Sequence, residues 1–379
     1  MNRLEALRDA GVSIWLDTLS RELLDSGRFA ELVRGCGVTG ATSNPAIFAR
    51  ALTGSDRYDE QLRSLAAGGM HDARDLFFAV ALDDVRRAAA ILRPAYERSR
   101  GNDGYVSFQC TPDIAGDAAA MVDQALDLST RLDPPNVLIK VPATAAGIEA
   151  LEELTARGVC VNVTLLFSVE RYDDVVDAYL RGLERRVTAG EPVSSIVSFA
   201  SFFVSRLDAK ADALLPPGSP LRGRIAIANA LRAYARYRAR FSGPRWDALA
   251  GAGARPQRPL WASTGTKDPA YSDVLYVEGL IAPGVVNTMP EETLRAFAAH
   301  GSVELHRDRD PLGALEELEE AGVDLKAMTD ELEREGIDGF RDAYDRLLTS
   351  VGRRAATKRV TRARAHPRGA GRPGCSAAA

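Results

Sequence analysis

Asn136-Val137-Leu138-Ile139-Lys140-Val141-Pro142 is a short apolar run that contains one lysine. Its valine, leucine and isoleucine residues predict a buried strand, where an ammonium group is costly to keep charged. Burial should therefore lower the pKa of Lys140 and favour its free amine. A neutral amine at the end of a strand can attack a carbonyl group and form a Schiff base. The rest of the sequence must show whether Lys140 has this catalytic role or only caps a strand.

Short apolar segments of this kind recur along the chain and alternate with longer amphipathic stretches. The predicted strands are Ser13–Asp17, Val38–Ser43, Tyr105–Gln109, Val137–Val141, Cys160–Thr164, Ile196–Ala200, Pro259–Ser263 and Val285–Asn287. The predicted helices include Gly116–Leu132, Ala146–Arg157, Val169–Ala189, Arg222–Phe241 and Glu291–Ala299. Eight strands that alternate with helices are typical of an α/β fold of the (β/α)8 TIM barrel type. Residues 311–351 predict two or more extra C-terminal helices that pack over this barrel.

Polar residues stand at the carboxyl ends of the predicted strands, although the strands themselves are apolar. They are Asp17, Asn44, Ser107, Gln109, Lys140, Asn162, Thr164, Ser201, Ser263 and Asn287. In a TIM barrel these strand ends meet at one face, where reactive groups collect. The pattern predicts a polar cavity around a single lysine.

The composition argues against several other classes of protein. The four cysteines and four histidines lack CxxC and HExxH spacing, so neither a disulfide framework nor a metal site is expected. No GxGxxG follows the first strand and no GxxxxGK[ST] occurs, which disfavours nucleotide binding. No stretch approaches about 18 apolar residues, and the first residues lack the apolar core of a signal peptide. We therefore expect a cytoplasmic protein with no membrane contact.

The charge distribution sets the last residues apart. Residues 353–379 contain eight of the 48 lysines and arginines and none of the 52 acidic residues. Such a segment can contact nucleic acid or another acidic surface. Its Gly, Pro and Ala content and its lack of apolar periodicity favour a disordered tail instead. We expect a barrel over residues 1–352, a separate basic tail over 353–379 and no nucleic-acid partner.

Seven motifs together resemble one family, the transaldolases, in the type found in actinomycetes. The matching stretches, in order, are SIWLDTLSRELL (13–24), GVTGATSNPAIFARAL (37–52), LIKVPATAAGIEAL (138–151), VCVNVTLLFS (159–168), SFASFFVSRLD (198–208), PLWASTGTKDPAYSD (259–273) and VVNTMPEETL (285–294). The resemblance implies a (β/α)8 barrel whose fourth strand carries the Schiff-base lysine. Counting strands places Lys140 on that strand.

The resemblance also implies roles for individual residues. Lys140 would be the nucleophile, Asp17 the acid/base for the carbon–carbon step, and Thr164 a ligand of the catalytic water. The substrate-binding residues would be Asn44, Ser107, Asn162, Ser201, Phe203, Arg206, Ser263 and Lys267, the last three of these around the phosphate. No cofactor is implied, because the lysine supplies the electrophile. The implied substrates are sedoheptulose 7-phosphate, glyceraldehyde 3-phosphate, fructose 6-phosphate and erythrose 4-phosphate of the pentose phosphate pathway.

The third strand departs from the family pattern. Transaldolases usually read VSxEVDxR here, whereas this chain reads Val-Ser-Phe-Gln-Cys-Thr-Pro over 106–112. Gln109 replaces the glutamate that works with the catalytic water, and glutamine cannot relay a proton near neutral pH. Related fructose 6-phosphate aldolases have glutamine at this position, but they carry tyrosine where this chain has Phe203. Three alternatives follow: a slower transaldolase, an aldolase that releases free dihydroxyacetone, and a paralogue that binds phosphosugars with little or no turnover.

Several of these residues also have ordinary structural explanations. Lys140 could snorkel or form an ion pair, and Asp17 could cap a helix. Asn44 before Pro45 could belong to a turn, and Arg206 could pair with Asp208 or Asp212. Cys110 should point away from the cavity, because side chains alternate along a strand. The complete set of motifs favours the catalytic interpretation over these alternatives.

Overall fold

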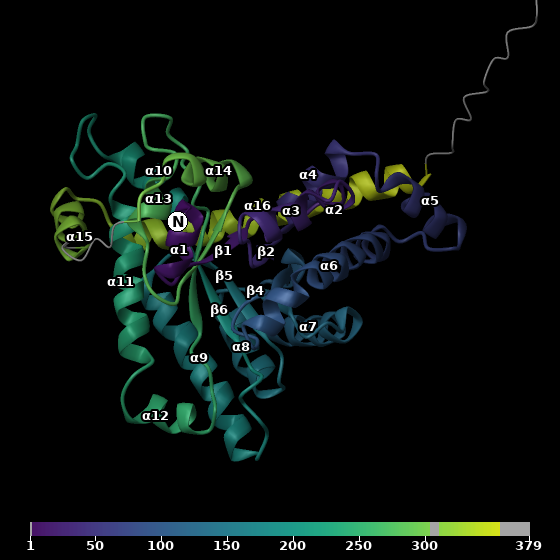
Figure 1. The fold of residues 1–379 in the computed structure, drawn as a ribbon, viewed down its shortest axis with the longest axis horizontal. Coiled ribbons are helices and arrows are strands. Elements are labelled where there is room, and N and C mark those ends of the chain that lie inside the picture. The colour runs from purple at the N-terminus through teal and green to yellow at the C-terminus, as the bar shows by residue number, and fades with distance from the viewer. Residues whose placement is uncertain (1, 304–310, 357–379) are drawn as a thin grey trace, which may run out of the picture.

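The chain forms a closed barrel of eight parallel strands with helices around it (Figure 1). The computed structural model describes residues 2–303 and 311–356. The strands are β1 (Ser13–Leu16), β2 (Gly40–Thr42), β3 (Val106–Gln109), β4 (Val137–Pro142), β5 (Val161–Leu166), β6 (Ser198–Phe203), β7 (Arg258–Ala262) and β8 (Val286–Met289). Each strand pairs with the next, and β8 pairs with β1 to close the barrel. The predicted TIM barrel is confirmed, and Lys140 lies on its fourth strand.

Helices connect the strands and form the outer layer. In chain order they are α1 (Arg3–Asp9), α2 (Arg21–Asp25), α3 (Arg28–Gly35), α4 (Pro45–Gly54), α5 (Asp59–Ala67), α6 (Ala73–Arg98), the short 3-10 helix η1 (Pro112–Ile114), α7 (Ala118–Leu132), α8 (Ala145–Ala156), α9 (Val169–Thr188), α10 (Ser205–Leu214), α11 (Ile225–Arg240), α12 (Pro244–Gly251), α13 (Leu275–Gly279), α14 (Glu291–His300), α15 (Pro311–Glu320) and α16 (Leu325–Ala356). Within the described ranges, no helix is both long and apolar enough to cross a membrane.

Aromatic side chains fill the barrel near the ends where the strands begin. The rings of Trp15 and Phe199 lie 4.9 Å apart, and Tyr105 packs against Phe199. Trp15 Nε1 donates to Asp103, in the loop before β3, at 2.8 Å. Gly40 makes room for the indole, because a Cβ there would lie 2.3 Å from the Trp15 ring. This apolar floor leaves the opposite end of the barrel for polar groups.

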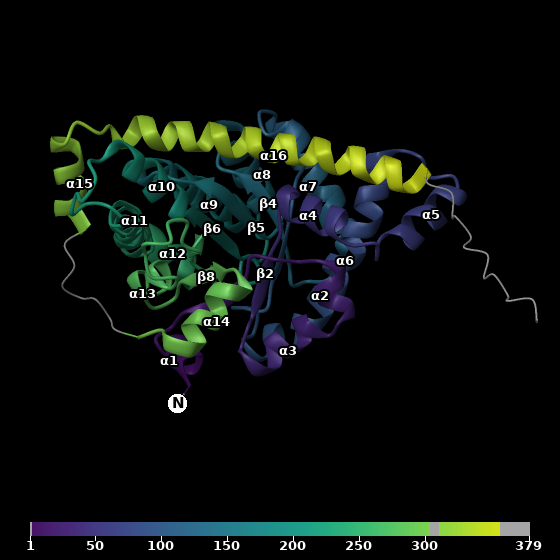
Figure 2. The same cartoon turned by 90° about the horizontal axis from the view of Figure 1, so that it is seen from above.

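The long helix α16 lies across the outside of the barrel, from α15 at one end to α5 at the other (Figure 2). It contacts α4, α6, α10 and η1, all of which follow or flank the carboxyl ends of strands. On its buried face, Gly336 lies against Leu165 of β5, and Tyr344 packs edge-on against Phe77. The prediction that extra C-terminal helices pack over the barrel is confirmed.

The end of α16 is fixed at the far side of the molecule. Arg354 Nη1 donates to the carbonyl oxygen of Ser55 at 2.6 Å and to Asp59 Oδ1 at 3.1 Å. The helix continues to Ala356, past the expected boundary at residue 352. The rest of the predicted tail, residues 357–379, lies outside the described residues.

Two glycines of α16 provide a matched test of this packing. A Cβ at Gly339 would meet no atom within 4 Å, whereas a Cβ at Gly336 would lie 2.8 Å from Leu165 Cδ2. Gly339→Ala should therefore raise stability by about 0.5–1 kcal/mol, since alanine is the better helix former. Gly336→Ala should lose this gain to overpacking and be less stable than Gly339→Ala by about 1 kcal/mol or more. Denaturant unfolding checks both values, and equal stabilisation by the two alanines would contradict the contact with Leu165.

Candidate active site

Lys140 lies near the end of β4, between Gln109 of β3 and Asn162 of β5 in the strand register. It is 4% exposed. The helix that follows is brought close to the strand end. Thr144 caps α8 by accepting from Gly147 N, and a Cβ at residue 147 would lie 1.8 Å from the Pro142 oxygen. The PATAAG sequence, which begins with the last residue of β4, therefore permits a tight turn from the strand into α8.

Burial sets the charge state of Lys140. It lowers the pKa of the amine from its ordinary value of 10.5 to about 8, and the negative charge of Asp17 opposes the shift. The pKa of Asp17 is raised, mainly by burial. A hydrogen bond from Thr18, at 3.3 Å, and the charges of Lys267 and Arg50 partly counteract that rise. The site thus pairs an amine that is easily deprotonated with a carboxylate, as nucleophilic and acid/base chemistry require.

Asp17 does not cap a helix. The N-cap of α2 is Ser20, whose hydroxyl accepts from Leu23 N. The helix-cap alternative for Asp17 is therefore wrong.

Three of the predicted substrate-binding residues form one hydrogen-bonded chain inside the barrel. Asn162 Nδ2 donates to Ser107 Oγ at 2.9 Å, and Ser201 Oγ donates to Asn162 Oδ1 at 2.7 Å. All three side chains are buried. The chain links β3, β5 and β6 and fixes the orientation of the Asn162 amide. Its bond to Ser107 uses one of the two N–H groups of that amide.

Gln109 and Thr164 each carry a buried oxygen that has no hydrogen-bond partner among the described residues. These atoms, Gln109 Oε1 and Thr164 Oγ1, belong to the strands on either side of β4. Buried polar atoms normally have partners, so unsatisfied ones mark a place where a water or ligand binds. The position fits the water expected beside Lys140.

Arg206 follows β6 and lies in the first turn of α10. It forms no ion pair or side-chain hydrogen bond within residues 2–303 and 311–356, and its guanidinium lies 5.5 Å from the centroid of the Phe203 ring. Burial lowers the pKa of this guanidinium, and the charge of Glu335 opposes the shift. Asp208 instead accepts from Ala226 N, and Asp212 accepts from Tyr271 and Gly223. The expected alternative pairing of Arg206 with Asp208 or Asp212 is therefore wrong.

Ser263 lies directly beyond β7 and has a φ of 58°, which is unusual for a serine. Its hydroxyl is 3.0 Å from that of Ser205, next to Arg206 in the chain. Backbone strain of this kind concentrates at binding sites. The Ser205–Ser263 contact therefore joins the chain just beyond β7 to the residue that precedes Arg206.

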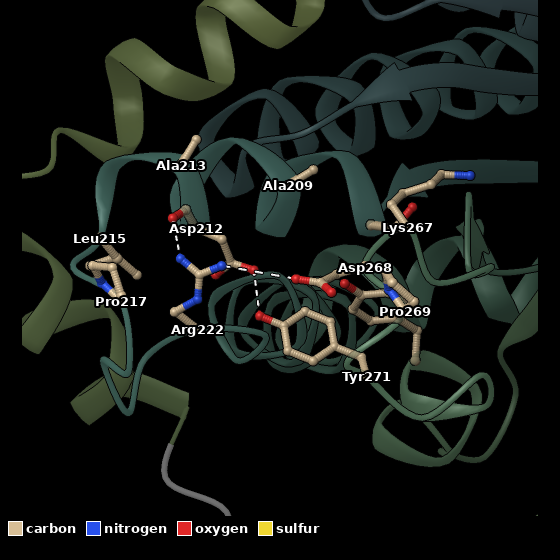
Figure 3. A pocket seen from close by; sticks show the side chains of 12 residues that line it. Ala209, Asp212, Ala213, Leu215, Pro217, Arg222, Lys267, Asp268, Pro269 and Tyr271 are labelled. Carbon is tan, nitrogen blue, oxygen red and sulfur yellow. Dashed lines mark hydrogen bonds and ion pairs between the residues drawn. The ribbon is translucent and has the colours of Figure 1, made fainter.

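Lys267 lies on the loop after β7, at the edge of a neighbouring cavity of about 670 Å³. Figure 3 shows its side chain directed away from the Asp212, Arg222 and Tyr271 cluster on the cavity's other side. The hydroxyl of Tyr271 donates to Asp212 Oδ2 at 2.6 Å and ties this loop to α10. Lys267 is exposed, and its charge acts on Asp17.

Asn44 has a structural task as well as its predicted one. Its Oδ1 accepts from Ile47 N at 2.9 Å, so it caps α4 in front of Pro45. The capping bond uses the carbonyl oxygen and leaves the amide N–H groups for a ligand.

Cys110 is 2% exposed, and burial raises the pKa of its thiol to about 12, as expected for a packed residue.

Other residues at the site were not predicted from the sequence. Arg50 of α4 and Glu292 of α14 act on Asp17 through their charges, in opposite directions. Ser205 bonds to Ser263, and Glu335 of α16 acts on Arg206. These residues lie on helices and loops whose meeting depends on packing between distant segments. Only their closeness to the strand-end motifs could have indicated Arg50, Ser205 and Glu292.

The sequence is similar throughout to known proteins. A family model described as Transaldolase/Fructose-6-phosphate aldolase matches residues 14–351. A transaldolase of Saccharopolyspora erythraea is 49% identical over 357 residues, which cover 92% of this chain and 97% of that protein. A transaldolase of Parafrankia sp. (strain EAN1pec) is 47% identical, with 92% and 96% covered. Transaldolase 1 of Streptomyces coelicolor is 47% identical, and the match covers 94% of this chain and 96% of that protein.

Proposed function

The chain belongs to the transaldolase/fructose-6-phosphate aldolase family and acts as a transaldolase, and we propose that Lys140 is its Schiff-base nucleophile. In this proposal the enzyme moves a dihydroxyacetone unit from sedoheptulose 7-phosphate to glyceraldehyde 3-phosphate. The products are erythrose 4-phosphate and fructose 6-phosphate. We propose that the reaction takes place in the cytoplasm.

The observation that carries the proposal is the buried Lys140, with its pKa lowered to about 8 and with Asp17 as its charged partner. The free amine attacks the ketose carbonyl carbon, and loss of water gives a protonated Schiff base. Asp17 takes the proton of the C4 hydroxyl, and the C3–C4 bond breaks with its electron pair moving into the enamine. The first aldehyde leaves, the acceptor aldehyde enters, and the same steps run in reverse. Hydrolysis then frees Lys140.

The remaining residues would position the sugar. Arg206, with its guanidinium unpaired, Ser263 and Lys267 would bind the phosphate, for which a guanidinium fork is well suited. Asn44 and Asn162 would donate to sugar hydroxyls, with Ser107 and Ser201 holding Asn162 in place. Phe203 would form the wall beside Arg206. Gln109 and Thr164 would hold the water that enters and leaves during Schiff-base formation.

Trapping tests the proposed nucleophile. The protein is incubated with fructose 6-phosphate, reduced with borohydride and digested, and the adduct is located by mass spectrometry. A three-carbon adduct on Lys140, with Lys210 and Lys267 unmodified, is the expected result. An adduct elsewhere, or none, would overturn the role of Lys140.

Gln109 favours a second candidate reaction, the release of free dihydroxyacetone from fructose 6-phosphate. Product release with and without erythrose 4-phosphate separates the two reactions. Transfer requires the acceptor aldehyde, whereas cleavage proceeds without it. Dihydroxyacetone formation at the same rate in both conditions would favour the aldolase.

Gln109→Glu should speed Schiff-base formation. A glutamate can relay a proton through the adjacent water, and general acid–base groups contribute about 10²–10⁴-fold, so a gain of roughly tenfold or more is expected. The rate of borohydride-trappable adduct formation measures it. Gln124→Glu is the matched control, because Gln124 hydrogen-bonds to Thr111 rather than lying beside Lys140 in the strand register. Unchanged or lower activity of Gln109→Glu would show that the pocket suits glutamine.

The activity should rise with pH around the pKa of Lys140. Below about pH 8 most of the buried amine carries a proton and cannot attack, so kcat/KM should increase through this value. On the acid side the raised pKa of Asp17 should bring the loss of its carboxylate to a higher pH than usual. A pH profile of kcat/KM with fructose 6-phosphate checks both limbs. A profile that stays flat from about pH 7 to about pH 9 would contradict the assignment of Lys140.

A further inference from the structure

A group of four charged residues joins α10 to the covering helix α16 beside the proposed phosphate site. Arg206 and Lys210 are one turn apart on α10, and Glu331 and Glu335 are one turn apart on α16. Residues four apart project from the same side of a helix. Lys210 Nζ lies 2.7 Å from Glu335 Oε1 and 2.9 Å from Glu331 Oε2. One ammonium group therefore holds both carboxylates.

Arg206 is the neighbouring cation of this group but takes no part in its ion pairs. Glu335 is the acidic residue whose charge acts on its guanidinium. The Glu335 side chain is 54% exposed and the Glu331 side chain 51% exposed, so their bonds to Lys210 contribute little to stability. The same ion pairs determine whether Arg206 has a carboxylate partner. While Lys210 binds Glu335, the partly buried guanidinium remains without a carboxylate partner.

We propose that Lys210 is a positioning residue that keeps Glu335 away from Arg206 and so leaves Arg206 open to the phosphate of the substrate. The inference rests on the proposed role of Arg206 in phosphate binding. A carboxylate and a phosphate bind the same fork of guanidinium N–H groups. Without Lys210, the remaining cation on α10 is Arg206, on which the charge of Glu335 already acts. Glu335 would then compete from within the molecule, where its effective concentration is high.

Lys210→Met tests this directly, because methionine keeps an unbranched side chain and removes the charge. The KM for fructose 6-phosphate should rise about fivefold, the size of one surface ion pair, with kcat nearly unchanged. The Ki of inorganic phosphate as a competitive inhibitor should rise by the same factor. Adduct formation with dihydroxyacetone, which has no phosphate, should stay as in the wild type.

The second substitution distinguishes positioning from direct contact. Adding Glu335→Gln to Lys210→Met should return KM to the wild-type value, because the amide cannot form an ion pair with Arg206. Glu335→Gln alone should not raise KM. Lys326→Met is the matched control on α16, where an exposed lysine pairs with Asp330, and it should leave KM unchanged.

Two outcomes would overturn the proposal: an unchanged KM in Lys210→Met, or a raised KM that Glu335→Gln does not restore. The second would mean that Lys210 contacts the phosphate itself or supports the fold. Arg206→Gln tests the underlying function separately. If that variant keeps the wild-type KM and phosphate Ki, the proposed phosphate site fails, whatever Lys210→Met shows.

Discussion

Lys140→Met should abolish the covalent reaction and at the same time make the protein more stable. Methionine removes the proposed nucleophile, so no adduct should be trapped, and kcat/KM should fall by about 10⁴-fold or more, as for other enzymes that lose their nucleophile. The gain in stability has a different cause. The folded protein holds an amine whose pKa is about 8, against an ordinary value of 10.5. At neutral pH this difference costs about 3 kcal/mol of folding free energy, which the substitution removes.

The pH dependence of that stability gain gives the prediction a second check. In the lysine protein, the unfolded chain binds more protons than the folded one between about pH 8 and pH 10.5, so its stability rises with pH over this window. The advantage of Lys140→Met should shrink over the same window. Denaturant unfolding at neutral and alkaline pH measures it. Lys326→Met should change neither activity nor this pH dependence, and a destabilised Lys140→Met protein would contradict burial of an unfavourable charge.

Asp17→Asn should separate Schiff-base formation from carbon–carbon bond cleavage. The amide cannot take the C4 hydroxyl proton, so cleavage should slow by about 10²–10⁴-fold. Lys140 is still present, and it loses the negative charge that raises its pKa, so the free amine remains available. Fructose 6-phosphate should therefore bind covalently but stay intact. After borohydride reduction, mass spectrometry should find the six-carbon phosphorylated adduct on Lys140 in place of the three-carbon one.

Glu292→Gln is the matched control for Asp17→Asn. Glu292 is exposed and acts on Asp17 only through its charge, which raises the pKa of Asp17. Its neutralisation should shift the acid limb of the pH profile slightly downwards and leave cleavage intact. Three-carbon adducts at the wild-type rate in Asp17→Asn would assign the proton transfer to another group.

The sequence predicted the barrel well because each strand has a local signature. The apolar run around Lys140, with its β-branched residues, corresponds to β4, and the helix pattern Val169–Ala189 matches α9 to within one residue. Strand ends were harder to predict, since they depend on the partner strand. β6 was expected over Ile196–Ala200 but covers Ser198–Phe203, because pairing with β7 continues to Phe203 opposite Ala262.

The site was predictable where its residues lie on strand ends, and less so elsewhere. Counting strands predicted that Lys140 lies on the fourth strand, as it does, and the charge of Asp17, at the end of the first strand, acts on the pKa of Lys140. The hydrogen bonds that join Ser107, Asn162 and Ser201 could not be predicted, because they depend on how β3, β5 and β6 are placed in the folded barrel. The contacts of Glu335 with Lys210 depend on where α16 crosses the molecule, and helical periodicity alone contains no such information.

The path of α16 also has a consequence for how the enzyme is made. Arg354 reaches back to Ser55, across 299 residues of sequence, so this contact cannot form until almost the whole chain has left the ribosome. Contacts between such distant residues form late in folding, because long loops must close first. All eight strands, Lys140 and Arg206 emerge earlier than the 32 residues of α16. In the nascent chain the proposed nucleophile Lys140 therefore emerges before Glu335, and the contacts that α16 makes with the rest of the molecule are among the last to form.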